Sequence, residues 1–193
     1  MIHIAIFASG GGSNAKAIIR YFENNTYIKV AVLLTNNPES GLFQMGTEYH
    51  IPCVLFKRDQ FRDQEYMLPL LQSYSIRYIV LAGFLWLIPH YMITHFKDKI
   101  FNIHPSLLPD FGGKGMYGRH VHEAVKNAHK KESGCTIHLV NEEYDRGKIL
   151  LQKSVTLTDE MSPEDIAKAV LGLEHTNYAP AIESYINKDS NKP

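Results

Sequence analysis

Asn102 and His104 are the first side chains in this sequence that could do chemistry. They stand in the run FNIHPSLLP, where an apolar, strand-like segment ends at Pro105. Residues two apart on an extended segment share a face, so an amide and an imidazole point the same way. Such a pair can hold a developing oxyanion and move a proton. The same pattern also fits a histidine that is hydrogen-bonded for purely structural reasons.

Asp145 is the acidic partner that this chemistry would use. It lies in the loop EEYDRG, in which Glu142 and Glu143 are most simply solvated turn residues. Asp145 could hold a local turn by accepting hydrogen bonds from nearby backbone N–H groups. It could also face His104 and raise the pKa of that ring towards neutral pH by stabilising its protonated form. The spacing along the chain does not decide between the two interpretations.

A glycine-rich loop, GGGSN at positions 10–14, follows the first apolar segment. Glycines let the backbone approach a ligand closely, and the start of a helix offers unpaired N–H groups. Gly12, Ser13 and Asn14 therefore form a candidate phosphate site at the carboxyl end of a parallel strand. The nucleoside-triphosphate motif is absent and the dinucleotide pattern G-x-G-x-x-G is incomplete. The alternative is a glycine-rich turn capped by Ser13 or Asn14.

Three further histidines are weaker candidates. His120 and His122 would supply two metal ligands on a strand, but on a helix residues two apart do not face each other. Because no acidic or cysteine cluster completes a ligand set, no metal site is expected. His138 lies in a segment of alternating pattern and is expected to be a satisfied strand histidine.

Two segments have two open interpretations each. The apolar stretch Phe84-Leu85-Trp86-Leu87-Ile88 is either part of the core or the wall of a pocket for a flat ring. The glycine-dense segment from Gly112 to Gly118 follows His104 closely, and it is either a lid over the site or a plain connection.

Composition limits the class of protein. The chain has 193 residues, of which 45% are hydrophobic and 21% charged, so it has the composition of a globular protein. Twenty basic residues balance 20 acidic residues, which argues against a broad nucleic-acid surface. Only two cysteines occur, which fits a reducing compartment. No charged leader precedes the first apolar segment, so a signal peptide is not expected. The apolar run from Tyr78 to Ile88 is too short to span a bilayer. A soluble, cytoplasmic protein is expected.

The elements that would position these residues alternate along the first half of the chain. Strands are expected at 3–8, 28–34, 52–56, 78–82 and 100–103, with helices around 17–22, 41–49, 61–74 and 89–96. Apolar strands separated by helices indicate a parallel sheet covered on both faces. We therefore expect an α/β fold, Rossmann-like and doubly wound, with a mostly parallel sheet.

The later part has a different pattern. Strands at 136–140 and 148–156 are joined by a short loop and should form an antiparallel C-terminal part of the sheet. Ser162 and Pro163 then predict a helix start, with Ser162 as cap, and the helix should run to about Ile186. The prediction is one domain over 1–187, followed by a polar tail over 188–193.

These motifs together give a resemblance to a known family. The sequence resembles the phosphoribosylglycinamide formyltransferases, folate-dependent enzymes of purine biosynthesis, from Ile4 to about Ile186. The likeness rests on SGGGSN at 9–14, LAGF at 81–84 and, most specifically, NIHPSLLP at 102–109. Asp145-Arg146-Gly147 is similar to the Asp-Gly-Gly segment of the family, and Glu174-His175 to its last helix.

The resemblance implies a formyltransferase fold with a sheet of about seven strands. It implies transfer of a formyl group from the co-substrate 10-formyltetrahydrofolate to the amine of N1-(5-phosphoribosyl)glycinamide, in de novo purine (IMP) biosynthesis. It further implies small-molecule substrates only, with no metal, no nucleic acid and no membrane, in a monomer or homodimer. The matching motifs assign catalysis to Asn102, His104 and Asp145; substrate phosphate to Gly12, Ser13 and Asn14; other substrate contacts to Glu174; and folate to Leu85, Trp86, Leu87, Ile88 and Asn102.

The sequence departs from the family pattern at several places, among them Tyr178-Ala179-Pro180, which has one residue more than the usual Tyr-Pro. Arg146 replaces the first glycine after the aspartate, and Trp86 stands where a basic or polar residue is common. The loop from Gly112 to Gly118 is longer than the usual connection. The basic residue that some members use near the formyl donor has no clean counterpart, and Arg62 and Gln64 compete for that role.

Two alternatives stay open beside the transferase. A formyltetrahydrofolate hydrolase-like enzyme uses similar residues with water as the acceptor, although that family carries an additional N-terminal domain. A related tRNA formyltransferase needs a further C-terminal domain that the sequence does not contain. From a different class, a non-catalytic module that binds a phosphate ligand could use the same scaffold.

Overall fold

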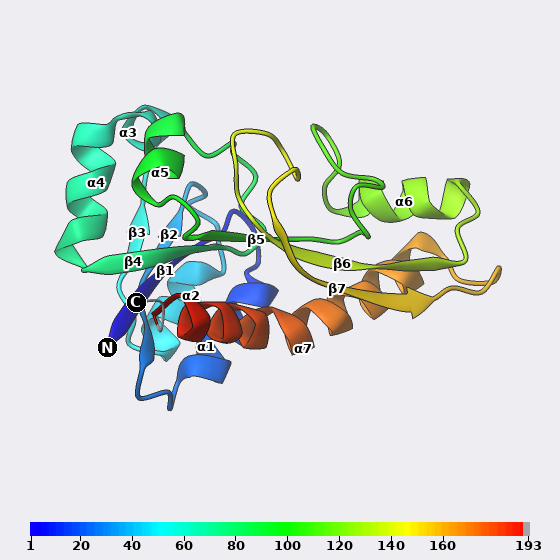
Figure 1. Cartoon of the computed structure of the whole chain (residues 1–193), viewed down its shortest axis with the longest axis horizontal. Coiled ribbons are helices and arrows are strands. Elements are labelled where there is room, and N and C mark those ends of the chain that lie inside the picture. Colours follow the sequence, from blue (N-terminus) through cyan, green and yellow to red (C-terminus); the bar gives the residue numbers. More distant parts are fainter. Residues whose placement is uncertain (191–193) are drawn as a thin grey trace. The chain divides into compact units, whose positions relative to one another are not determined.

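The computed structural model describes residues 1–190 and divides into two compact units, Met1–Phe101 and Asn102–Pro193. Across the sheet the strands follow the order β3-β2-β1-β4-β5-β6-β7. Strand β5 (Ile100–His104) contains the boundary between the units, because Asn102 is the first residue of the second unit. The sheet has seven strands, parallel in its first part and antiparallel at the end of the chain (Figure 1), so the predicted fold class is confirmed.

The first unit is built on parallel strands. β1 pairs in parallel with β2 on one side and with β4 on the other, and β2 pairs in parallel with β3. Helices α1 and α2 pack against β2, and α4 packs against β4. The elements are β1 (Ile2–Phe7), α1 (Ser13–Phe22), β2 (Ile28–Thr35), α2 (Leu42–Glu48), β3 (Cys53–Leu55), α3 (Arg58–Arg62), α4 (Gln64–Ser73), β4 (Ile76–Leu81) and α5 (His90–His95).

The core of this unit follows from its apolar strands. From Ile4 to Phe7, β1 is completely buried, as expected for a strand with neighbours on both edges and helices against the sheet. One helix prediction was wrong. The segment expected to form a single helix over 61–74 contains two helices, because Asp63 interrupts the first and caps the second by accepting a hydrogen bond from the Glu65 N–H.

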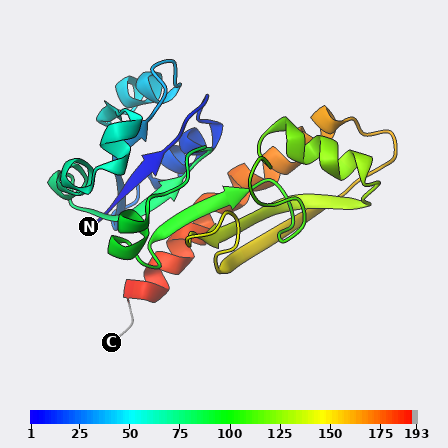
Figure 2. The ribbon, with the colours of Figure 1, turned by 90° about the horizontal axis from the view of Figure 1, so that it is seen from above.

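The second unit contains an antiparallel pair and two helices. Its further elements are α6 (Arg119–Asn127), β6 (Glu132–Leu139), β7 (Ile149–Thr156) and α7 (Pro163–Ser190). β6 and β7 pair antiparallel from Glu132 opposite Thr156 onward, as predicted. Helix α7 contacts both strands and α6, and Figure 2 shows it alongside the two long strands.

The start of α7 confirms the predicted cap. The Ser162 hydroxyl accepts a hydrogen bond from the Asp165 N–H, and the Asp165 carboxylate accepts one from the Ser162 N–H. The helix continues to Ser190, beyond the predicted end at Ile186, so residues 188–190 of the expected tail are helical. Positions 191–193 of that tail lie outside the described residues. That both units make up a single domain stays a prediction.

Within residues 1–190, no helix combines the length and the apolar character that a membrane crossing requires.

Candidate active site

Asp145 is the centre of a buried polar cluster in the second unit. Its Oδ2 lies 3.5 Å from Nδ1 of His104, and its Oδ1 lies 3.7 Å from Nε2 of His138. The side chain of Asp145 is 11% exposed, and those of His104 and His138 are 5% and 2% exposed. Of the two interpretations of Asp145, the structure therefore supports the one in which the carboxylate faces His104. Both separations exceed ordinary hydrogen-bond lengths, and the carboxylate attracts a ring only when that ring is protonated.

Asn102 joins this cluster through His138. The Asn102 Nδ2 lies 3.1 Å from His138 Nε2, and His138 Nδ1 lies 2.9 Å from the carbonyl oxygen of Leu139. A carbonyl only accepts, so Nδ1 carries the proton, and in the neutral ring Nε2 accepts from the Asn102 amide. His138 is therefore satisfied, as predicted, and it also fixes the direction of the Asn102 side chain. One N–H of that amide is left for a ligand.

The opposite edge of the His104 ring contacts the loop that follows it. Nε2 of His104 lies 2.8 Å from the carbonyl oxygen of Phe111 and donates to it. The neighbouring Gly113 N–H donates to Asp145 Oδ2 at 2.9 Å. Phe111, just before the glycine-dense segment, and Gly113 within it thus contact two groups of the cluster.

Strand ends and a strained loop position these groups. Asn102 and His104 lie on β5, His138 lies on β6, and Asp145 lies in the connection from β6 to β7. Asp145 has φ 56°, an uncommon value for a residue with a side chain, and such strain is often found at functional positions. Gly147 is required for steric reasons, because a Cβ there would collide with the carbonyl oxygen of Leu139. Arg146 does not have a positive φ, so its backbone conformation does not require the glycine that the family usually has at this position.

The loop after His104 is held from β6 and β7. The Thr136 hydroxyl donates to the Ser106 carbonyl at 2.6 Å and accepts from the Leu108 N–H at 3.0 Å. The Gln152 amide donates to the Leu108 carbonyl at 2.8 Å. These hydrogen bonds fix the backbone immediately after His104, which keeps the imidazole at the rim of the sheet.

The environment shifts the pKa of both charged partners. Burial lowers the pKa of His104, although Asp145 and the Phe111 carbonyl act in the opposite direction. The expected net rise of the His104 pKa is therefore wrong in direction, because desolvation of the buried ring outweighs the carboxylate at 3.5 Å. Burial alone would raise the pKa of Asp145, but His138, His104 and the Gly113 N–H together lower it.

The predicted phosphate loop lies in the first unit, at the carboxyl end of β1. Gly12, with φ 76°, is the N-cap residue of α1, so Ser13 and Asn14 are the first residues of that helix instead of its cap. No side chain caps this helix end, which leaves its N–H groups directed outward. The loop is held by Ser40, whose hydroxyl donates to the Gly10 carbonyl at 3.0 Å.

The expected wall of a ring pocket, Leu85 to Ile88, divides into two parts. Leu85 and Leu87 are exposed, whereas Ile88 is buried. Trp86 packs on Phe56 and Phe61, with ring centroids 6.0 and 5.7 Å away, within a larger group of aromatic rings. Its other neighbour is the Arg58 guanidinium, 5.2 Å from the centre of its ring. Arg58 is thus a basic residue that contacts this segment, and the choice between Arg62 and Gln64 near the formyl donor stays open.

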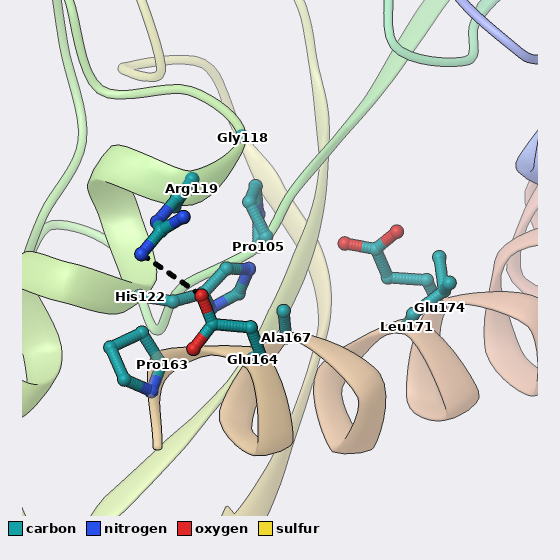
Figure 3. A pocket seen from close by; sticks show the side chains of 9 residues that line it. All are labelled: Pro105, Gly118, Arg119, His122, Pro163, Glu164, Ala167, Leu171 and Glu174. Atoms are coloured by element: carbon teal, nitrogen blue, oxygen red, sulfur yellow. Dashed lines mark ion pairs between the residues drawn. The ribbon is translucent and has the colours of Figure 1, made fainter.

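A pocket of about 450 Å³ lies between α6 and α7 of the second unit. Figure 3 shows Glu174 and His122 reaching towards this space from α7 and α6. Glu174 is 6% exposed, and the pocket also contains Pro105, the residue after His104. An ion pair between Arg119 and Glu164, 3.0 Å long, links the first turns of the two helices. The structure therefore gives the predicted substrate residue Glu174 a cavity beside the polar cluster.

Comparison with known proteins decides the family. A family model described as formyl transferase matches residues 2–182, which is most of the chain. The chain belongs to the formyl transferase family. This formyl transferase is 32% identical over 191 residues to the phosphoribosylglycinamide formyltransferase of Bacillus subtilis, covering 96% of this chain and 95% of the relative.

Other relatives and solved structures agree. The chloroplastic phosphoribosylglycinamide formyltransferase of Arabidopsis thaliana is 39% identical over 93% of this chain, but the chain spans only 63% of that protein's length. The phosphoribosylglycinamide formyltransferase structure from Bacillus halodurans has a TM-score of 0.86 at 31% identity, covering 97% of this chain and 96% of the other. The corresponding structure from Brucella melitensis has a TM-score of 0.85 at 34% identity, covering 95% of both chains.

Sequence reasoning missed several parts of the formyl transferase site. It did not connect His138 with Asn102, and it missed the Phe111 carbonyl and the Gly113 N–H. The alternating apolar pattern along β6 was the available signal for His138. It indicates that the side chain lies on a buried face, but it does not show which residue that side chain contacts. For the two loop residues no signal was available, because their backbone groups carry the contacts and any residue type supplies those.

Proposed function

We propose that this formyl transferase transfers a formyl group from 10-formyltetrahydrofolate to the amine of N1-(5-phosphoribosyl)glycinamide, a step of purine biosynthesis. The observation that carries the proposal is the convergence of His104 and His138 on the Asp145 carboxylate, with Asn102 held by His138. A simple binding module does not need buried acid–base groups at a strand end. The names of the relatives support the choice of acceptor.

In the proposed reaction the neutral amine of the acceptor attacks the formyl carbon, and the carbonyl oxygen becomes an oxyanion. The free N–H of Asn102 and an N–H of protonated His104 donate to this oxyanion. The carbon–nitrogen bond to the folate then breaks, and the proton lost by the amine ends on the folate nitrogen. Asp145 stabilises the charged imidazole while this proton moves.

The hydrogen bond from His104 to Phe111 decides which N–H of the ring is available to the oxyanion. In the free protein its Nε2–H is bound to the Phe111 carbonyl and its Nδ1 faces Asp145. Protonation adds a second N–H at Nδ1, on the side of Asp145. The ring can therefore donate this N–H to the oxyanion while its Nε2–H stays bound to the Phe111 carbonyl.

Substrate binding is assigned to three sets of residues. Gly12, Ser13 and Asn14 bind the acceptor's phosphate through the N-terminus of α1. Glu174 contacts the acceptor from the pocket beside Pro105. The folate is assigned to Leu85, Trp86, Leu87, Ile88 and Asn102; the exposed Leu85 and Leu87 supply apolar contact for its ring. Both substrates are small molecules, and the free thiols Cys53 and Cys135 fit a reducing compartment such as the cytoplasm.

A spectrophotometric assay of donor deformylation tests the proposal. The chain is mixed with a 10-formyl folate analogue, with and without glycinamide ribonucleotide. Release of the deformylated folate only in the presence of the ribonucleotide supports the transferase. Release with water alone identifies a hydrolase, and no release in either arm identifies a binding module; either result overturns the proposal.

A further inference from the structure

His122 is a buried polar residue that the proposed mechanism does not use. Its side chain belongs to α6 and lines the pocket that also contains Glu174, and the residue is only 5% exposed. Its Nδ1 is buried and has no hydrogen-bond partner among residues 1–190. A buried polar atom without a partner lowers the stability of the fold, because its lost hydrogen bonds to water are not replaced. A residue kept at such a cost is a candidate for contact with a ligand.

The lining of the pocket indicates which kind of ligand fits. Pro105 and Leu171 offer apolar surface, whereas Glu164 and Glu174 offer carboxylates. The guanidinium of Arg119 is already paired with Glu123 at 2.6 Å and with Glu164 at 3.0 Å. Because Arg119 is already engaged and Glu174 adds a further carboxylate, this lining disfavours an anion. Apolar faces combined with hydrogen-bond acceptors suit a neutral ring that carries hydroxyl groups, such as a sugar.

We propose that His122 is a specificity-determining residue that hydrogen-bonds a ribose hydroxyl of the acceptor, in the pocket it shares with Glu174. This inference rests on the proposed function, because it takes the ribonucleotide as the acceptor. The position is suitable, since Pro105 of the pocket directly follows His104. A sugar bound there lies beside the group that acts on the amine.

The chemistry of the ring agrees with this role. Burial and the nearby His104 lower the pKa of His122, which favours the neutral ring, and one nitrogen of that ring accepts a hydrogen bond from a hydroxyl. The ring lines the cavity and the torsion between Cβ and the ring is broad, so the ring can reorient about that bond when a ligand binds.

Three variants separate binding from structure. His122→Phe keeps a flat ring without nitrogen atoms, and His122→Asn restores a polar group close to the position of Nδ1. His120→Phe is the matched control, because His120 lies on the same helix, is 66% exposed and does not line the pocket. The acceptors are glycinamide ribonucleotide and an analogue whose ribose lacks its hydroxyl groups.

The expected result for His122→Phe is a KM for the ribonucleotide raised about tenfold, with kcat and the KM for the folate donor little changed. His122→Asn recovers much of the lost affinity, and His120→Phe behaves like the unmodified chain. The hydroxyl-free analogue binds His122→Phe and the unmodified chain alike. The melting temperature of His122→Phe stays the same or rises, because the orphaned nitrogen is gone, whereas a structural role predicts a fall.

A measurement on the unmodified chain covers the case in which His122→Phe does not fold. With ¹⁵N-labelled histidine, the ring signals of His122 shift on addition of glycinamide ribonucleotide and do not shift with the hydroxyl-free analogue. An unchanged KM in His122→Phe, or equal ring shifts with both acceptors, overturns the inference. Formyl transfer by the unmodified chain is measured independently, so this failure is distinguishable from failure of the proposed function.

Discussion

The Oδ2 of Asp145 lies 3.5 Å from the Nδ1 of His104, with both side chains almost completely buried. At this distance the carboxylate favours the protonated ring through its charge, while burial favours the neutral ring. Burial wins, so the pKa of His104 lies below its ordinary value. Burial thus disfavours the imidazolium that the proposed mechanism uses, and Asp145 opposes this effect.

Asp145→Asn should lower the pKa of His104 further, because the charge that opposes desolvation is removed. Protonated His104 is lost as pH rises through its pKa, so the alkaline decline of kcat should move to lower pH in Asp145→Asn. Turnover near neutral pH should fall with it. Histidine ring signals, followed by NMR during a pH titration and assigned with His104→Ala, report the pKa directly. An unchanged or higher His104 pKa in Asp145→Asn contradicts this assignment.

His138→Ala should reduce kcat through Asn102, since it removes the acceptor that fixes the amide at 3.1 Å. If the two residues act together, their effects are not additive. His138→Ala should cost at least tenfold in kcat in the unmodified chain, and much less when Asn102→Ala is already present. Steady-state kinetics of the two single variants and the double variant complete the cycle. Equal losses in both backgrounds show that His138 acts independently of Asn102.

Ser13→Asp should change stability and acceptor binding in opposite directions. No acidic residue lies in the first turn of α1, so a carboxylate there should stabilise the helix by about 0.5 kcal/mol. The same charge repels the phosphate of the acceptor, so the KM for glycinamide ribonucleotide should rise at least tenfold. Ser13→Asn is the uncharged control of similar size. If both Ser13→Asp and Ser13→Asn leave this KM unchanged, the loop does not bind the phosphate and serves only as the start of the helix.

Gly147→Ala should destabilise the second unit, because the added Cβ collides with the carbonyl oxygen of Leu139. Forced overpacking of this kind costs about 1–3 kcal/mol in the free energy of unfolding. Gly172→Ala is the matched control. That glycine lies in α7 with open space around the added Cβ, so alanine should stabilise the helix by about 0.5–1 kcal/mol. Urea denaturation of both variants checks the two signs, and a Gly147→Ala chain as stable as Gly172→Ala contradicts the steric argument.

Local patterns predicted most of the fold. Strands that are buried on both faces have long apolar runs, and β1, β2 and β4 were recognisable for that reason. The helix cap that Ser162 and Asp165 form could be predicted from their residue types and spacing alone. The break between α3 and α4 was missed, because the helical pattern continues through Asp63 and only its hydrogen bond to Glu65 shows the second cap.

The site could be predicted only in part. The shared face of Asn102 and His104 follows from strand geometry, and both side chains belong to the polar cluster. The contact of His104 with Asp145 joins distant parts of the chain, and spacing does not reveal such a contact. The direction of the His104 pKa shift was missed because it depends on burial, which is a property of the whole fold. His122 also could not be ranked, since its unpartnered Nδ1 is visible only in the folded chain.

The most direct test of the account is the turnover number of His104→Ala, measured beside His120→Ala in the formyl transfer assay. Removing a donor to the oxyanion costs about a hundredfold to a thousandfold in kcat. The account predicts a loss of this size in His104→Ala and unchanged turnover in His120→Ala, whose side chain is exposed on α6. A His104→Ala enzyme that keeps nearly the full kcat would contradict the assignment of catalysis to this cluster.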